Sequence, residues 1–113
     1  MSYPHRSRAR TVRGVLRAAR RLIEDPEHWT TGVLARDAAG EWIEPQDNGA
    51  VCWCAVGAVA AVSPDVDLED QAATLLDRTA EERGGVFASR VNDERGHAAV
   101  LEMFDAAIRG AKP

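Results

Sequence analysis

Residues 50–58 read AVCWCAVGA, and they place both cysteines of the chain and one of its three tryptophans at the head of a run of small apolar residues. Folded proteins usually bury cysteine and tryptophan. Two thiols beside one indole therefore mark either the packing centre of the domain or a reactive site. Residues 50–62 carry almost no polar side chain, so we expect a buried helix here, capped by Asp47 or Asn48 and anchored by the Trp53 indole N–H on a backbone carbonyl.

The apolar residues on either side predict three further helices, because they recur at three- and four-residue steps. These residues are Val12, Val15, Leu16, Ala19, Leu22 and Ile23; Leu68, Ala72, Leu75, Leu76 and Thr79; and Val100, Leu101, Phe104, Ala107 and Ile108. We expect a break at Asp25-Pro26, a cap at Asp67 and a stop at Gly84-Gly85. Residues 86–91 are expected as a short strand or an extended passage, followed by an Asn92-Asp93 turn that caps the last helix.

A β-hairpin is predicted between the first two helices. Residues 32–36 and 41–44 flank DAAG at 37–40, which begins with Asp and ends with Gly as hairpin turns often do. An isolated hairpin is marginally stable, so Trp42 together with Leu34 or Val33 is expected to pack one face of it on the helices. The predicted fold class is thus α+β, mainly α, with about four helices packed with one β-hairpin. We expect one globular domain over residues 9–110, preceded by a flexible basic tail at 1–8.

Composition and the two cysteines indicate the compartment. No run of 18 apolar residues is present, and the charged N-terminus is not followed by an apolar signal region, so membrane insertion and secretion are disfavoured. Cysteines separated by a single residue, as Cys52 and Cys54 are, do not readily form a disulfide with each other. We therefore expect a cytoplasmic protein with free thiols, without a cofactor or a membrane partner.

Charge is distributed unevenly along the chain. Residues 1–21 hold seven arginines and no acid, whereas the remainder holds seven bases and eighteen acids. The basic head can pair with the acidic face of its own domain or bind an anionic partner such as nucleic acid. If the head binds nucleic acid, the candidate contact residues are Arg6, Arg8 and Arg10.

The thiols also allow a catalytic alternative. A thiol in the first turn of a helix is favoured as thiolate, which applies to Cys52 and Cys54 alike. Cys54 with His97 as base and Asn92 as orienting group has the composition of a small thiol-dependent hydrolase or transferase. The competing interpretation is that both cysteines are buried packing residues. Zinc binding is not expected, because residues two apart on a helix point about 200° away from each other.

A third set of residues has the composition of a polar ligand pocket. Aromatic, basic and acidic side chains on the predicted loops and turns suit a small molecule or a peptide. The candidates are Trp29, Arg36, Asp37, Trp53 and Asp93.

The order of several short motifs resembles a known family. These motifs are Leu22-Ile23, Trp29-Thr30-Thr31-Gly32, Ala35-Arg36-Asp37 with Gly40, Trp53-Cys54-Ala55-Val56-Gly57-Ala58, Asn92-Asp93, and His97 with Val100-Leu101. Over residues 12–109 the chain resembles a family of small actinobacterial and phage proteins, domain-of-unknown-function family number 6197. The resemblance implies no activity, and it suggests an accessory role in phage or host defence. We expect a non-enzymatic binding or interaction protein directed at a protein or a small molecule.

Overall fold

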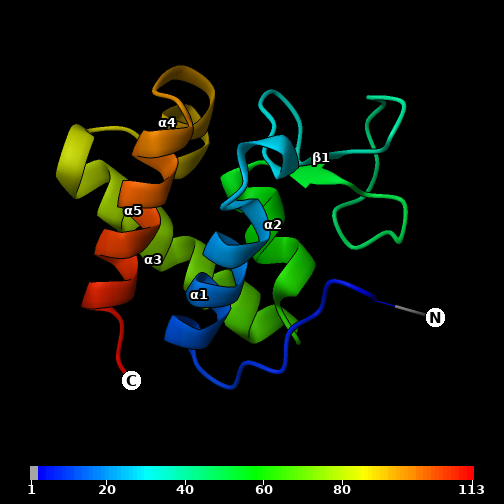
Figure 1. Ribbon diagram of the computed structural model, residues 1–113. Coiled ribbons are helices and arrows are strands. Elements are labelled where there is room, and N and C mark those ends of the chain that lie inside the picture. The colour runs from blue at the N-terminus through cyan, green and yellow to red at the C-terminus, as the bar shows by residue number, and fades with distance from the viewer. Residues whose placement is uncertain (1–2) are drawn as a thin grey trace.

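The computed structural model describes residues 3–113 of the chain. Within that range, α1 (Val12–Ile23) is followed by the 3-10 turn η1 (Pro26–His28), the strands β1 (Ala35–Arg36) and β2 (Cys52–Trp53), and the helices α2 (Ala55–Val62), α3 (Val66–Gly84), α4 (Ala88–Glu94) and α5 (His97–Gly110). α3, α4 and α5 lie to one side of α1 and α2, and the loops that carry the two strands lie to the other (Figure 1). The mainly helical α+β class is confirmed, with one helix more than expected.

Helix α1 follows its apolar periodicity. The Thr11 side chain accepts a hydrogen bond from the Gly14 backbone N–H at 3.0 Å and so begins the helix. Its fully buried residues are Val15, Leu16, Ala19 and Ile23. The predicted break at Asp25 is confirmed, because Pro26 opens η1.

Helix α2 begins five residues later than predicted. Its first residue is Ala55, and the Cys54 side chain caps it by accepting from the Gly57 N–H at 3.3 Å. The predicted caps are wrong: Asp47 instead accepts from Gly49 within its own loop, and Asn48 lies in the same loop. Residues 51–53 are Val, Cys and Trp. Val and Trp favour strands, and this preference outweighs the continuous apolar pattern that predicted a helix here.

The predicted hairpin forms only in part. β1 pairs antiparallel with β2, in the register Ala35↔Trp53 and Arg36↔Cys52. The expected partner segment adds one bridge, Arg36↔Trp42, around the 37–40 turn. Trp42 is 56% exposed, so its predicted packing on the helices is wrong. The anchor is Trp53, whose indole N–H donates to the Pro45 carbonyl at 2.9 Å as predicted.

Helix α4 was not predicted, and it replaces the expected strand or extended passage at 86–91. The Ala88 N–H at its start donates to Asp77 on α3 at 2.9 Å, so its cap comes from eleven residues upstream. Asn92 and Asp93 lie inside α4 and do not cap α5, which begins after Gly96 at φ +89°. The Asn92-Asp93 turn signal gave no indication of α4, because the carboxylate that caps this helix, Asp77, lies eleven residues upstream on α3.

Both ends of α3 lie close to the predicted positions. Asp65, two residues before the predicted Asp67, caps it by accepting from the Leu68 N–H at 2.8 Å. The predicted stop is confirmed, because Gly85 adopts the left-handed φ of +75°.

The N-terminal segment contacts the domain before residue 9. The Ser7 backbone N–H and hydroxyl both donate to the Val62 carbonyl at 2.8 Å. His5 donates to the Asp47 carbonyl at 3.1 Å and packs edge-on against Trp53, with ring centroids 4.7 Å apart. The structure describes residues 3–8 of the predicted tail, and the contacts of His5 and Ser7 hold part of this segment against the rest of the domain. No helix within residues 3–113 is long and apolar enough to span a membrane.

We predict that Gly57→Ala destabilises the protein by about 1–3 kcal/mol, because the added methyl group would collide with the Leu34 carbonyl group. Gly110→Ala is the control, since nothing lies within 4 Å of its new Cβ. It should change the free energy of unfolding by less than about 1 kcal/mol. Urea unfolding of both variants tests this, and equal stability would contradict the close approach.

Candidate functional site

The side chain of Asn92 joins three separate segments of the chain. Asn92 is 1% exposed. Its Oδ1 accepts from the Trp29 indole N–H at 2.7 Å and from the Ala55 N–H at 2.9 Å. Its Nδ2 donates to the Thr30 carbonyl at 3.0 Å and to Asp93 Oδ1 at 3.1 Å. All four hydrogen-bonding positions of the amide are thus occupied.

This amide also completes the start of α2. A helix leaves its first N–H groups without intrahelical partners. Asn92 takes the N–H of Ala55, and Cys54 takes that of Gly57. Because sulfur is a weak acceptor, the Asn92 amide is the stronger of the two caps.

Two of the predicted ligand residues, Arg36 and Asp37, hold the loop that follows Thr30 in place. The Arg36 guanidinium donates to the Thr30 hydroxyl at 2.9 Å, the Thr31 carbonyl at 3.0 Å and the Gly40 carbonyl at 3.1 Å. Asp37 accepts from two backbone N–H groups of its own turn. Both side chains fix loop geometry. The structure therefore brings Trp29, Asn92, Asp93 and Cys54 together and links Arg36 to them through Thr30. The Trp53 carbonyl accepts from the Thr30 N–H at 3.0 Å, whereas Asp37 bonds within its own turn.

Cys54 and His97 belong to different hydrogen-bond networks. Burial raises the pKa of the Cys54 thiol, and the charge of Asp93 adds to this, outweighing the helix N–H groups that lower it. The His97 ring N–H donates to the Ile23 carbonyl at 2.6 Å, and the ring packs 5.2 Å from that of Trp29. No hydrogen bond within residues 3–113 joins this thiol to an imidazole.

Cys52 does not lie in the first turn of a helix, which is where a thiolate would be favoured. It is in strand β2, outside the first turn of α2, so that prediction is corrected. The part of the chain that the structure describes contains no group of three or more His, Cys, Asp or Glu side chains able to hold a metal ion.

A cleft of about 400 Å³ opens beside Cys54 and Asp93, and we call it the Cys54 cleft. It is lined by Gly32, Val33, Leu34, Cys54, Val56, Asp77, Phe87, Ser89 and Asp93. The sequence nominated only Cys54 and Asp93 among these. The others come from separate segments of the chain, and no sequence pattern joined them to Cys54 and Asp93.

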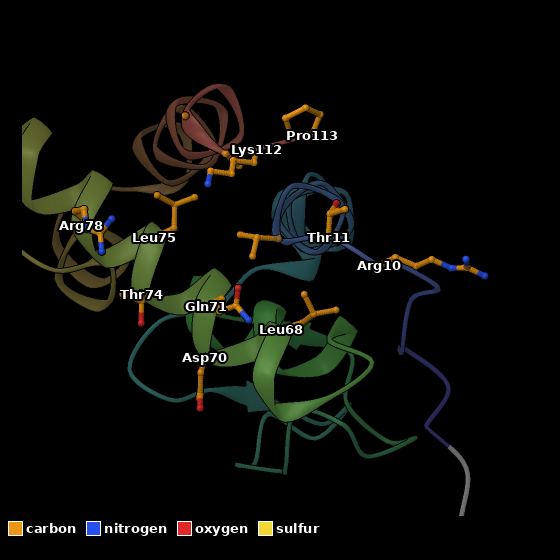
Figure 2. Close-up of a pocket in the computed structure, with 13 residues that line it drawn as sticks. Arg10, Thr11, Leu68, Asp70, Gln71, Thr74, Leu75, Arg78, Lys112 and Pro113 are labelled. Atoms are coloured by element: carbon orange, nitrogen blue, oxygen red, sulfur yellow. The ribbon is translucent and has the colours of Figure 1, made fainter.

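A larger groove of about 810 Å³ lies between the start of α1, α3 and the residues after α5 (Figure 2). Among the nominated residues, only Arg10 lines it, and its guanidinium extends away from the groove. Arg6 lies 4.1 Å over the Tyr3 ring, and Arg8 is exposed.

The comparisons with known proteins give one family. The model of a family of unknown function (DUF6197) matches residues 7–110. The chain belongs to this family. No curated protein and no solved structure gives a significant match. Because the family description names no activity, the function is inferred from the geometry of the site.

We predict that Asn92→Ala lowers the free energy of unfolding by about 3 kcal/mol, because it leaves buried N–H groups of Trp29 and Ala55 without an acceptor. Asp93→Ala, at an exposed neighbouring position, should cost less than about 1 kcal/mol. Urea unfolding monitored by tryptophan fluorescence compares the two. Similar losses for both variants would contradict the central role of the amide.

We predict that the free energy of unfolding falls as pH rises past 9.0, the ordinary pKa of the Cys54 thiol. Above that pH the unfolded thiol ionises while the folded one keeps its proton, so alkali favours unfolding. Cys54→Ser, which keeps a side-chain cap, should lack this part of the pH dependence. The measurement is urea unfolding of both proteins from neutral pH to about pH 10. Identical profiles would refute the raised pKa.

Proposed function

We propose that the protein is a binding protein whose Cys54 cleft holds an apolar group that carries a positive charge. The observation that supports this most is the lining of the cleft. Two carboxylates and several apolar side chains face the same hollow, and no Lys, Arg or His lines it. Clefts with apolar walls and a few fixed polar groups are the usual form of ligand sites.

The carboxylates favour a cationic occupant. Asp77 accepts from the Ala88 N–H, and Asp93 accepts from the Gly32 N–H and from Asn92. In each case the hydrogen bonds within residues 3–113 go to Oδ1 and leave Oδ2 for a ligand. Neither carboxylate forms a salt bridge to another described residue. Two such charges beside one hollow attract a cation and repel an anion.

The apolar walls are exposed and held in place. Leu34 is 39% and Phe87 is 58% exposed. Phe87 stands between the left-handed turn at Gly85 and the Ala88 N–H bonded to α3, so its backbone is fixed at both sides. Exposed aromatic residues on a fixed backbone are frequent anchors in binding sites.

The other functions considered have less support. The catalytic set Cys54, His97 and Asn92 has no thiol–imidazole contact, and Asn92 bonds the Trp29 indole where a triad would need an imidazole. The accessory role in phage or host defence stays a prediction. Binding in the Cys54 cleft requires none of these assignments.

The test is an amide NMR titration with benzylamine, using benzyl alcohol as the neutral probe of the same shape. We expect shifts at Gly32, Cys54 and Asp93, and tighter binding of the amine. Asp93→Asn keeps the Oδ1 acceptor but removes one charge, and should weaken amine binding by up to about fivefold while leaving the alcohol unchanged. Phe87→Ala should weaken both probes.

Trp42→Ala is the matched control, because Trp42 is equally exposed and does not line the cleft. It should leave binding of both probes unchanged. Shifts confined to other surfaces, or equal affinity for amine and alcohol, would overturn the proposal.

A further inference from the structure

A row of arginines covers the solvent side of α1. At about 100° per residue, Arg13, Arg17, Arg20 and Arg21 fall within about 100° of the helix circumference. Arg17 and Arg21 are exposed, and Arg13 and Arg20 are half-buried at the edge of this row. Arg10, just before the helix, extends out from the same end and away from the neighbouring groove (Figure 2).

Helix α5 adds one more arginine to this surface. Arg20 donates to Asp105 at 2.7 Å, and Arg13 donates to the Ala111 carbonyl at 2.6 Å. These contacts run in opposite directions along the two helices, so α1 and α5 are antiparallel neighbours (Figure 1). Arg17, between Arg13 and Arg20, is therefore level with the turn that carries Arg109. We call Arg10, Arg13, Arg17, Arg20, Arg21 and Arg109 the arginine face.

The charge of the arginine face is largely uncompensated. Its two neighbouring acids, Glu24 and Asp105, are both bonded to Arg20. Arg10, Arg17, Arg21 and Arg109 are exposed and form no salt bridge with any described residue. Only Arg20 follows the expectation that the basic head pairs with its own domain. The net charge of −4 does not cancel this surface, since salt screens charges beyond about 8 Å.

We propose that the arginine face binds the phosphate backbone of a nucleic acid duplex. Every base in it is arginine, whose planar guanidinium matches phosphate oxygens in pairs. From Arg13 to Arg21 helix α1 rises about 12 Å, roughly a third of a turn of a duplex, which places more than one phosphate within reach.

The composition of the surface separates this ligand from other polyanions. No aromatic side chain belongs to the arginine face, so it offers no platform for unpaired bases. The exposed large apolar residues are Tyr3, Leu34, Trp42, Val51, Val66 and Phe87, and none of them lies on α1 or α5, so these two helices offer no apolar side chain that would insert into an anionic membrane. Contacts to phosphates alone are independent of sequence.

The experiment is fluorescence anisotropy of a labelled DNA duplex at low and physiological salt. The triple variant Arg17→Gln, Arg21→Gln, Arg109→Gln should bind at least tenfold more weakly. It should also reduce the slope of log K against log salt, by about 0.9 for each lost phosphate contact.

The matched control is Arg83→Gln, Arg90→Gln, Arg95→Gln, which removes the same charge from exposed positions on α3, on α4 and directly after α4. It should bind like the unmodified protein, and circular dichroism should show both variants folded. Absence of binding at low salt, or equal weakening in the two variants, would overturn the proposal. Equal or tighter binding of a single strand or of polyglutamate would overturn the assignment to a duplex.

Discussion

The buried amide of Asn92 is the contact on which the arrangement of the site depends. α4 has only seven residues, too few to be stable alone. Its one buried polar side chain, Asn92, bonds Trp29 and Thr30 just after η1 and the first residue of α2. In a buried environment hydrogen bonds are strong and missing partners are costly. The amide therefore fixes these segments in one relative position, and Asp93, the next residue, is delivered to the Cys54 cleft.

A second constraint is steric, and it places the opposite wall of the cleft. The Leu34 carbonyl lies where a Cβ on Gly57 would stand, and it accepts the Cys54 N–H at 3.1 Å. The loop carrying Leu34 can therefore lie directly on α2 only because residue 57 is glycine. Arg36 then clamps the rest of the loop through its three hydrogen bonds. Backbone packing thus fixes the wall of the cleft that carries Leu34.

Sequence signals that act within a few residues predicted the elements of this fold that depend only on neighbouring residues. Periodicity and stop residues gave α1, the end of α3 and the body of α5, because each signal acts within a few residues. The β1–β2 pairing joins residues 16 and 18 positions apart. The first N–H of α4 bonds Asp77, and Asn92 bonds partners 37 and 63 positions away. Asn92, Asp93 and Cys54 were recognised as important residue types, yet the expected local cap was wrong because their partners are distant. Phe87 and Asp77 carried no pattern that joined them to the site.

Binding of a cation and thiol catalysis make opposite demands on the Cys54 cleft. A nucleophilic cysteine needs a lowered pKa and a nearby positive group. Here burial raises the pKa of Cys54, and the negative charge of Asp93 raises it further. Burial, with a smaller contribution from the carboxylate that we propose for binding a positive ligand, therefore favours the protonated thiol. Cys54 contributes a small apolar surface and a helix cap, and the surroundings that suit the proposed cation disfavour a thiolate nucleophile.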